Sequence, residues 1–177
     1  SHHNAISVAI SVTTLDEELA RTMEPRTSTP AARLRTISEL SAAGVRTHVM
    51  VAPVIPGLND SEIPRILEAV RDAGADGASY ILLRLPLTVE PVFVEWLRRI
   101  ERNRAERVET RLRASRGGEM SDSRFGKRMR GEGEFAENIA KTFKVFARKY
   151  GLNARPAPLS TAAFRRPLPR SGQMRLF

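Results

Sequence analysis

The stretch VMVAPVIPGLND, residues 49–60, determines how the rest of the chain is interpreted. Its first half is apolar and β-branched, a pattern that predicts a strand buried on both faces. Its second half contains Pro56-Gly57 and Asn59-Asp60, which are typical of a turn that leads into a helix. At the carboxyl end of such a strand, Gly57 would let the backbone approach a ligand closely. An ordinary turn between a strand and a helix has the same composition, so the stretch alone leaves both interpretations open.

Composition narrows the class of protein. The chain has 177 residues and no cysteine, which excludes disulfides and cysteine-ligated metal or iron–sulfur centres within it. No apolar run approaches the roughly 20 residues that span a bilayer, so we expect no membrane association. Residues 1–4 lack the pattern of a secretory signal, which predicts a cytoplasmic location. Because the chain does not start with Met, it could be processed, tagged or cut from something longer.

The formal net charge of +9 is distributed unevenly. Residues 1–103 carry a net charge of −2, whereas residues 104–130 carry +5 and the last 24 residues carry +5. The basic C-terminal part could therefore meet the phosphate backbone of DNA or RNA. A solvated basic face or an Arg-rich tail without fixed structure would have the same composition.

Three strands alternate with helical segments in the first half of the chain. We expect the strands at residues 5–12, 47–54 and 79–85. Thr29-Pro30 is typical of a helix start, and Gly44 and Gly74 follow helical periodicity as stop signals. Right-handed crossovers between such strands give a parallel sheet, so this is an α/β chain whose carboxyl strand ends share one edge.

The second half is predicted to be helical with a basic tail. Residues 89–115 are expected to be helical, with an inward face made by Val92, Trp96, Ile100, Val108 and Leu112. Residues 135–150 are predicted to form another amphipathic helix. The predicted division is a barrel portion at 1–115, a loop and helix at 116–152, and a flexible tail at 153–177. Three strands buried on both faces need further neighbours. Either the chain self-associates, or it is the second half of a larger barrel, the interpretation we favour.

Five motifs in order carry a family resemblance: VTTLD at 12–16, MEPR at 23–26, VAPVIPGLND at 51–60, YILLRLP at 80–86 and DSRFGKRMRGEGEFA at 122–136. Together they resemble the C-terminal half of bacterial radical SAM proteins, in the family related in its core to spore photoproduct lyase, a DNA-repair enzyme. The resemblance implies a partial (β/α) barrel fragment that contributes the last three strands of the core. It also implies that S-adenosylmethionine (SAM) binds along the carboxyl ends of the strands.

The resemblance assigns cofactor-binding residues to each strand end. Ser11 and Thr13 would contact the ribose of SAM, and Glu24 and Arg26 would contact its ribose or carboxylate. The family pattern G-x-I-x-G-x-x-E, near the adenine, falls on Pro53, Ile55, Gly57 and Asp60, so its first Gly is Pro and its Glu is Asp. The remaining residues predicted at the adenine are Val54, Leu83 and Arg84.

The same resemblance predicts what this chain lacks. In that superfamily a C-x3-C-x2-C loop binds the [4Fe–4S] cluster that reductively cleaves SAM, and this chain has no cysteine. We therefore expect a separate N-terminal half of the barrel to bring the cluster, and we expect no catalytic or metal-ligating residue here. The parent protein would be a radical SAM enzyme acting on nucleic acid, and the isolated chain would be inactive. His48 is interpreted as an ordinary strand residue.

The C-terminus suggests a partner. Gln173, Leu176 and Phe177 resemble the peptide with which bacterial proteins bind the DNA sliding clamp, although a terminal Leu-Phe also arises by accident. Two other functions stay open. The chain could be a non-catalytic α/β nucleic-acid-binding or adaptor module tethered to the clamp. It could also be a freestanding nucleotide-binding α/β domain that completes its sheet by dimerising.

Overall fold

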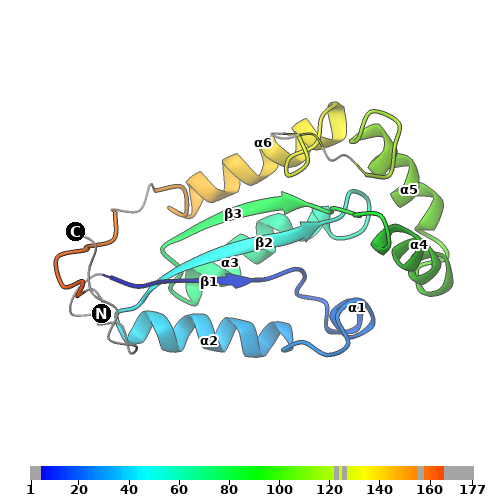
Figure 1. Cartoon of the computed structure of the whole chain (residues 1–177). Helices are drawn as coiled ribbons and strands as arrows, with labels where there is room; N and C mark the ends of the chain where they lie inside the picture. Colours follow the sequence, from blue (N-terminus) through cyan, green and yellow to red (C-terminus); the bar gives the residue numbers. More distant parts are fainter. Residues whose placement is uncertain (1–4, 122–123, 125–126, 155–157, 166–177) are drawn as a thin grey trace, which may run out of the picture.

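The computed structural model of the chain describes residues 5–121, 124, 127–154 and 158–165. The predicted clamp-binding residues Gln173, Leu176 and Phe177 lie outside this part. The described elements form a parallel sheet with helices packed beside it and beyond one of its ends (Figure 1). Within the described residues, no helix is long and apolar enough to cross a membrane.

Three parallel strands in the order β1-β2-β3 form the sheet: β1 (Ser7–Ser11), β2 (Arg46–Val54) and β3 (Gly77–Leu82). The predicted α/β class with three parallel strands is confirmed. The predicted end of the third strand at residue 85 is wrong. After Leu82 the ladder continues with one bond, from Leu83 N to Val54 O at 2.8 Å, and then the guanidinium of Arg116 binds the Leu83 carbonyl at 2.6 Å.

Helices cover one face of this sheet. They are α2 (Pro30–Ala42), α3 (Ile63–Asp72) and α6 (Glu134–Lys149), and Figure 1 shows α3 behind the strands with α2 and α6 along the two sides. Their apolar faces pack with the β2 side chains Val49 and Val51 into one core. The prediction of strands buried on both faces is wrong for β1, in which residues 7, 9 and 11 are exposed.

The local signals for the helices that follow β1 explain why the chain turns there. Asp16 caps α1 (Glu17–Met23), since its Oδ1 accepts hydrogen bonds from Glu18 N at 2.9 Å and Leu19 N at 3.0 Å. Thr29 caps α2 in the same way, with Pro30 at the first helical position as predicted. The loop between these helices therefore starts and ends at defined positions beside the carboxyl end of β1.

A second apolar cluster lies beyond the carboxyl ends of β2 and β3. It is built by α1, α4 (Val89–Ile100) and α5 (Ala105–Ala114), and includes Leu19, Ile55, Leu58, Leu83, Leu85, Phe93, Leu97, Val108, Leu112 and Met120. Two helices therefore replace the helical stretch predicted at residues 89–115. The predicted inward face is wrong for Val92, which is 66% exposed, and for Ile100, which is 44% exposed, while Trp96 is half-buried at the cluster's periphery. Val108 and Leu112 are buried as predicted.

The C-terminal helix follows its prediction. Ile139 and Phe143 of α6 are buried against the sheet, and the ring of Phe143 lies 4.9 Å from that of Tyr80 on β3. A short 3₁₀ turn, η1 (Asp60–Glu62), precedes α3. Because α6 packs into the same core as the strands, it belongs with the sheet in space; the predicted boundaries at residues 115 and 152 stay predictions.

Candidate functional site

Side chains from three elements meet at the carboxyl end of β1. Thr13 Oγ1 lies 3.0 Å from the carbonyl of Ala52 and 3.1 Å from Glu24 Oε1, so these two acceptors share its one hydroxyl proton. Glu24 Oε2 accepts a charge-assisted hydrogen bond from Arg33 Nη2 at 2.7 Å, and Arg33 Nη1 donates to the carbonyl of Ser11 at 2.9 Å. The predicted residues Ser11, Thr13 and Glu24 are thus brought together.

Arg33 holds this group together and was not predicted. It stands in the second turn of α2, nine residues after Glu24, so neither helical nor strand periodicity connects the two. The predicted contact of Arg26 with SAM stays a prediction. The Glu24 carboxylate pairs with Arg33, whereas Arg26 is exposed in the loop between α1 and α2.

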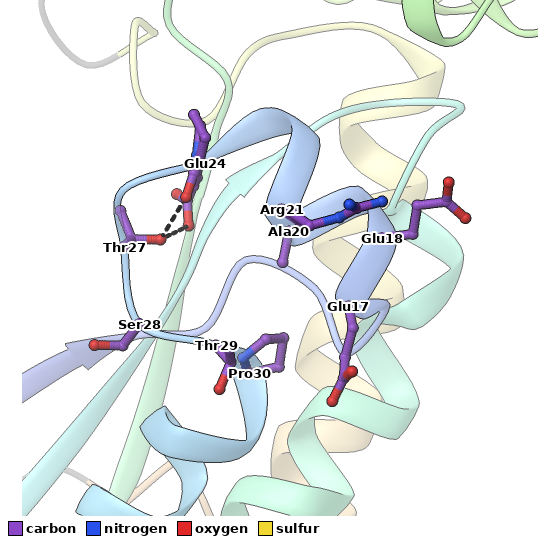
Figure 2. A pocket seen from close by; sticks show the side chains of 10 residues that line it. Glu17, Glu18, Ala20, Arg21, Glu24, Thr27, Ser28, Thr29 and Pro30 are labelled. Atoms are coloured by element: carbon purple, nitrogen blue, oxygen red, sulfur yellow. Dashed lines mark hydrogen bonds between the residues drawn. The ribbon is translucent and has the colours of Figure 1, made fainter.

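A cavity of about 500 Å³ opens beside Glu24, between α1 and the first residues of α2 (Figure 2). Three carboxylates and one guanidinium line the cavity, together with hydroxyl groups, so the lining carries a net negative charge. Figure 2 shows Thr27 pointing at Glu24, whose carbonyl accepts from Thr27 Oγ1 at 3.0 Å. The full lining is Glu17, Glu18, Ala20, Arg21, Glu24, Pro25, Thr27, Ser28, Thr29 and Pro30. This volume falls within the range of sites for small molecules.

Asn59 organises the turn after β2. Its Oδ1 accepts from Ile55 N at 2.7 Å, while its Nδ2 donates to the carbonyls of Thr13 at 2.8 Å and Pro53 at 3.0 Å. The side chain is 1% exposed. It therefore fastens the ends of β1 and β2 to each other, a role that its place in a turn sequence did not indicate.

The predicted adenine wall is buried by the chain itself. Gly57 has a φ of 88°, which favours glycine, and its N–H donates to Asp60 Oδ1 at 2.9 Å. Its carbonyl accepts from Arg107 Nη2 at 3.0 Å, and a Cβ at this position would meet the side chain of Arg111 at 3.1 Å. The close approach predicted for a ligand at Gly57 is thus made by α5. Val54 and Ile55 are equally buried.

Glu62 makes contacts that the motif comparison did not predict. Its Oε1 accepts from Thr14 Oγ1 at 2.7 Å and its Oε2 accepts from Leu15 N at 2.9 Å. The departure from the family pattern at Asp60 therefore leaves the Asp capping its own turn, while the carboxylate two residues later binds the segment after β1.

The end of β3 is held by a buried cation. Arg116 is 3% exposed, and besides the carbonyl of Leu83 it binds the carbonyls of Lys127 at 3.2 Å and Arg128 at 3.0 Å. Leu83 is buried by these contacts, whereas Arg84 is exposed. The two predicted residues at this strand end thus differ in access to solvent.

Among the described residues, no group of three or more His, Asp or Glu side chains is placed to hold a metal ion, and the sequence has no cysteine. The residues present do not fit a [4Fe–4S] cluster, whose irons are held by thiolates. An acidic cavity with hydroxyl groups does fit a cationic ligand with hydroxyls of its own.

Comparisons with known proteins match parts of this chain. Uncharacterized proteins of Mycobacterium bovis and Mycobacterium tuberculosis are 43% identical over 96 residues, which is 53% of this chain and 28% of each relative. An uncharacterized protein of Acidianus two-tailed virus is 29% identical over 80 residues, 42% of this chain and 27% of that protein. The chain thus spans little more than a quarter of these relatives, and no solved structure matches it. Residues 2–70, which include β1, α1, α2, β2 and most of α3, match the Radical SAM superfamily.

Proposed function

We propose that this chain is the SAM-binding second half of a radical SAM enzyme whose cluster ligands lie in another segment of the protein. The observation that carries the proposal is the superfamily match over residues 2–70, together with the parallel strands whose polar residues gather at one carboxyl edge. The relatives' greater length supports a further segment. When bound together, SAM and the cluster would supply radical chemistry.

The acidic cavity supports SAM as its ligand. SAM carries a positive sulfonium and an amino group, which the carboxylates of Glu17, Glu18 and Glu24 would attract. Its ribose hydroxyls both donate and accept, as do those of Thr27 and Ser28. Thr13 contacts Glu24 from the strand end and Ser11 is connected to it through Arg33, and the Glu24–Arg33 pair would keep the Glu24 carboxylate oriented.

The test is SAM binding by the full-length protein, measured by titration calorimetry after reconstitution with iron and sulfide. We expect Glu24→Gln to weaken SAM binding about tenfold or more, since it removes a charged partner. Glu39→Gln, an exposed carboxylate on α2, is the matched control and should bind normally. Because Glu24 also pairs with Arg33, Glu17→Gln provides a second variant outside that network. Unchanged affinity in both cavity variants would contradict the assignment.

Nucleic acid is the substrate class that the charge distribution favours. Arg98, Arg102 and Arg113 of the α4–α5 region line a hollow of about 360 Å³ with Thr110. Glu106 and Glu109 line it too, and Arg98 pairs with Glu109 through bonds of 2.7 and 2.9 Å, which hold the pKa of Glu109 below its usual 4.5. Arg102 and Arg113 then stand against the single carboxylate of Glu106, which leaves the lining with a net positive charge that could meet phosphates.

Fluorescence anisotropy with a labelled single-stranded oligonucleotide tests the substrate class. We expect Arg102→Ala with Arg113→Ala to weaken binding at every sequence and to reduce the slope of log K against log salt by about 0.7 per lost phosphate contact. Arg65→Ala, an exposed arginine on α3, is the control. Salt-dependent binding without SAM binding would instead support the non-catalytic adaptor, and no binding at all would exclude a nucleic-acid role for this surface.

A further inference from the structure

Helix α4 carries an apolar stripe beside the side that packs into the second apolar cluster. Val89, Val92, Trp96 and Ile100 recur three and four residues apart, so they follow one another along the helix and form this α4 stripe. Val92 is 66% exposed, and Val89 and Ile100 are 44% exposed. Trp96 is half-buried, because it also contacts the cluster. The stripe is therefore open to solvent in the described part of the chain.

Exposed apolar side chains are concentrated at this helix. Among the described residues, nine large apolar side chains are exposed, and four of them lie between residues 87 and 100. Leu87, two residues before α4 begins, is 92% exposed and extends the apolar surface beyond the stripe. Single exposed apolar side chains are ordinary, whereas several on one side of a helix mark a surface that binds a partner.

Two opposite charges border the α4 stripe. Glu95 follows Val92 by three residues and Arg99 follows Trp96 by three residues, so both lie along its edge. Their side chains stand 3.8 Å apart, yet the Glu95 side chain is 76% exposed and that of Arg99 is 65% exposed. An exposed pair within one helix contributes little free energy. Both charges are therefore accessible to a partner, the negative one nearer the start of the helix.

We propose that the α4 stripe is the interface of a two-fold symmetric dimer, in which α4 packs antiparallel against α4 of a second copy. About a two-fold axis midway between residues 95 and 99, Glu95 of each copy meets Arg99 of the other, so both contacts join opposite charges. The same axis brings Val92 near Ile100 of the second copy and the two Trp96 side chains near each other. The charges therefore complement a second copy of the same surface.

Other arrangements leave these charges opposed. In a parallel pair of helices, Glu95 would face Glu95 and Arg99 would face Arg99, and like charges in contact cost free energy. A nucleic acid would bring phosphates to Glu95 as well as to Arg99. Arg98, which lines the basic hollow, follows Trp96 by two residues and so lies on another side of α4. The dimer is therefore independent of the cofactor and substrate proposed above.

The small size of the surface sets the expected affinity. One helix face buries less than the roughly 1,200 Å² of a stable interface, so we expect a weak dimer with a Kd on the order of 10–100 µM. At about 1 µM the protein would be largely monomeric, and unfolding measured there reports on the single chain.

Sedimentation equilibrium of the full-length protein between about 5 and 500 µM measures the association. Glu95→Arg alone and Arg99→Glu alone each put like charges into both contacts, and each should weaken the dimer about tenfold or more. An equimolar mixture of these two variants should associate like the unchanged protein, because every contact in the mixed dimer joins opposite charges. Glu39→Arg on α2, which alters an equally exposed pair with Arg35, is the matched control and should dimerise normally.

Val92→Ser tests the apolar part of the interface without changing its charge. It occurs twice in each dimer and should weaken association about tenfold. Thermal melting at low concentration verifies that the variants fold. A full-length protein that stays monomeric over the whole range would overturn the inference, since the stripe would then be open or covered by another part of the same chain. The inference also fails if the mixture associates no better than either single variant.

Discussion

Beyond the end of β2, the side-chain amide of Asn59 gives backbone N–H and C=O groups the hydrogen-bond partners that a strand or helix would otherwise provide. Its carbonyl oxygen satisfies the N–H of Ile55, and its NH₂ group satisfies the carbonyls of Thr13 and Pro53. Buried backbone groups without partners are costly, so one side chain here prevents three such losses. The turn in which it lies would not otherwise keep the ends of β1 and β2 together.

Asn59→Ala is expected to lower the free energy of unfolding by about 3 kcal/mol, because three buried polar groups lose their partner. Asn103→Ala is the matched control, since Asn103 is exposed between α4 and α5. It should change stability by less than about 0.5 kcal/mol. Urea unfolding of both variants measures the difference. A loss below about 1 kcal/mol at Asn59 would mean that water replaces the amide and that the junction is not organised by it.

His48 makes a prediction about pH. Burial lowers its pKa from 6.5, so the folded state favours the neutral ring. The unfolded state binds more protons as the pH falls below 6.5, and stability therefore decreases between pH 6.5 and the lowered pKa of the folded protein. Above pH 6.5 this contribution is fully present. An NMR titration of the His48 ring should show a midpoint below 6.5. A midpoint at or above that value would mean that the ring is more hydrated than its contacts indicate.

At the scale of elements, α4 shows where sequence patterns stop being informative. Val92, Trp96 and Ile100 recur at helical spacing, but so do Phe93 and Leu97, and both stripes are apolar. Periodicity alone cannot decide between two apolar faces. The choice follows from the long-range contacts of α4 with Leu19 and Leu85, which no local signal contains. Capping signals such as Thr29-Pro30, in contrast, act within one turn and predicted the start of α2 correctly.

The residues of the candidate site likewise fall into two groups, those that local motifs predict and those that depend on contacts between elements. Ser11, Thr13 and Glu24 could be found because short motifs place them near one strand end. Arg33 and Asn59 could not, because their partners lie on other elements and the bonds depend on how those elements pack. The one-sided burial of β1 was missed because Val8 and Ile10 dominate its apolar character, although its serines and alanine alternate with them.

Adjacent substitutions on α4 test the assignment of its faces. Phe93→Ala removes an aromatic side chain that is 8% exposed and should lower the free energy of unfolding by about 3 kcal/mol. Val92→Ala removes apolar surface that is already 66% exposed and should cost less than about 0.5 kcal/mol. Guanidinium unfolding of the two variants gives the comparison. The opposite ranking would show that α4 is rotated and that Val92 faces the second apolar cluster.

For the whole molecule, the three-stranded sheet is covered on one face and at one end, but its edge at β1 is left unpaired in the described part of the chain. The helices α2, α3 and α6 close one face, and the loop and helices around Arg116 close the ends of β2 and β3. In the described part of the chain, no strand pairs with the outer edge of β1. An unpaired edge exposes backbone donors and acceptors that other strands can bind. With relatives more than three times as long as the matched segments, another part of the protein is the proposed partner for this edge.

We therefore predict that amide hydrogen exchange in β1 slows at least about tenfold in the full-length protein relative to this chain alone, because ladder hydrogen bonds would protect the edge. Exchange in β2, already paired on both sides, should change little and serves as the internal control. Mass spectrometry of peptides covering residues 5–12 and 46–54 measures both. Equal β1 exchange in the two proteins would show that the edge stays unpaired, and the proposed second half of the barrel would then have to join elsewhere.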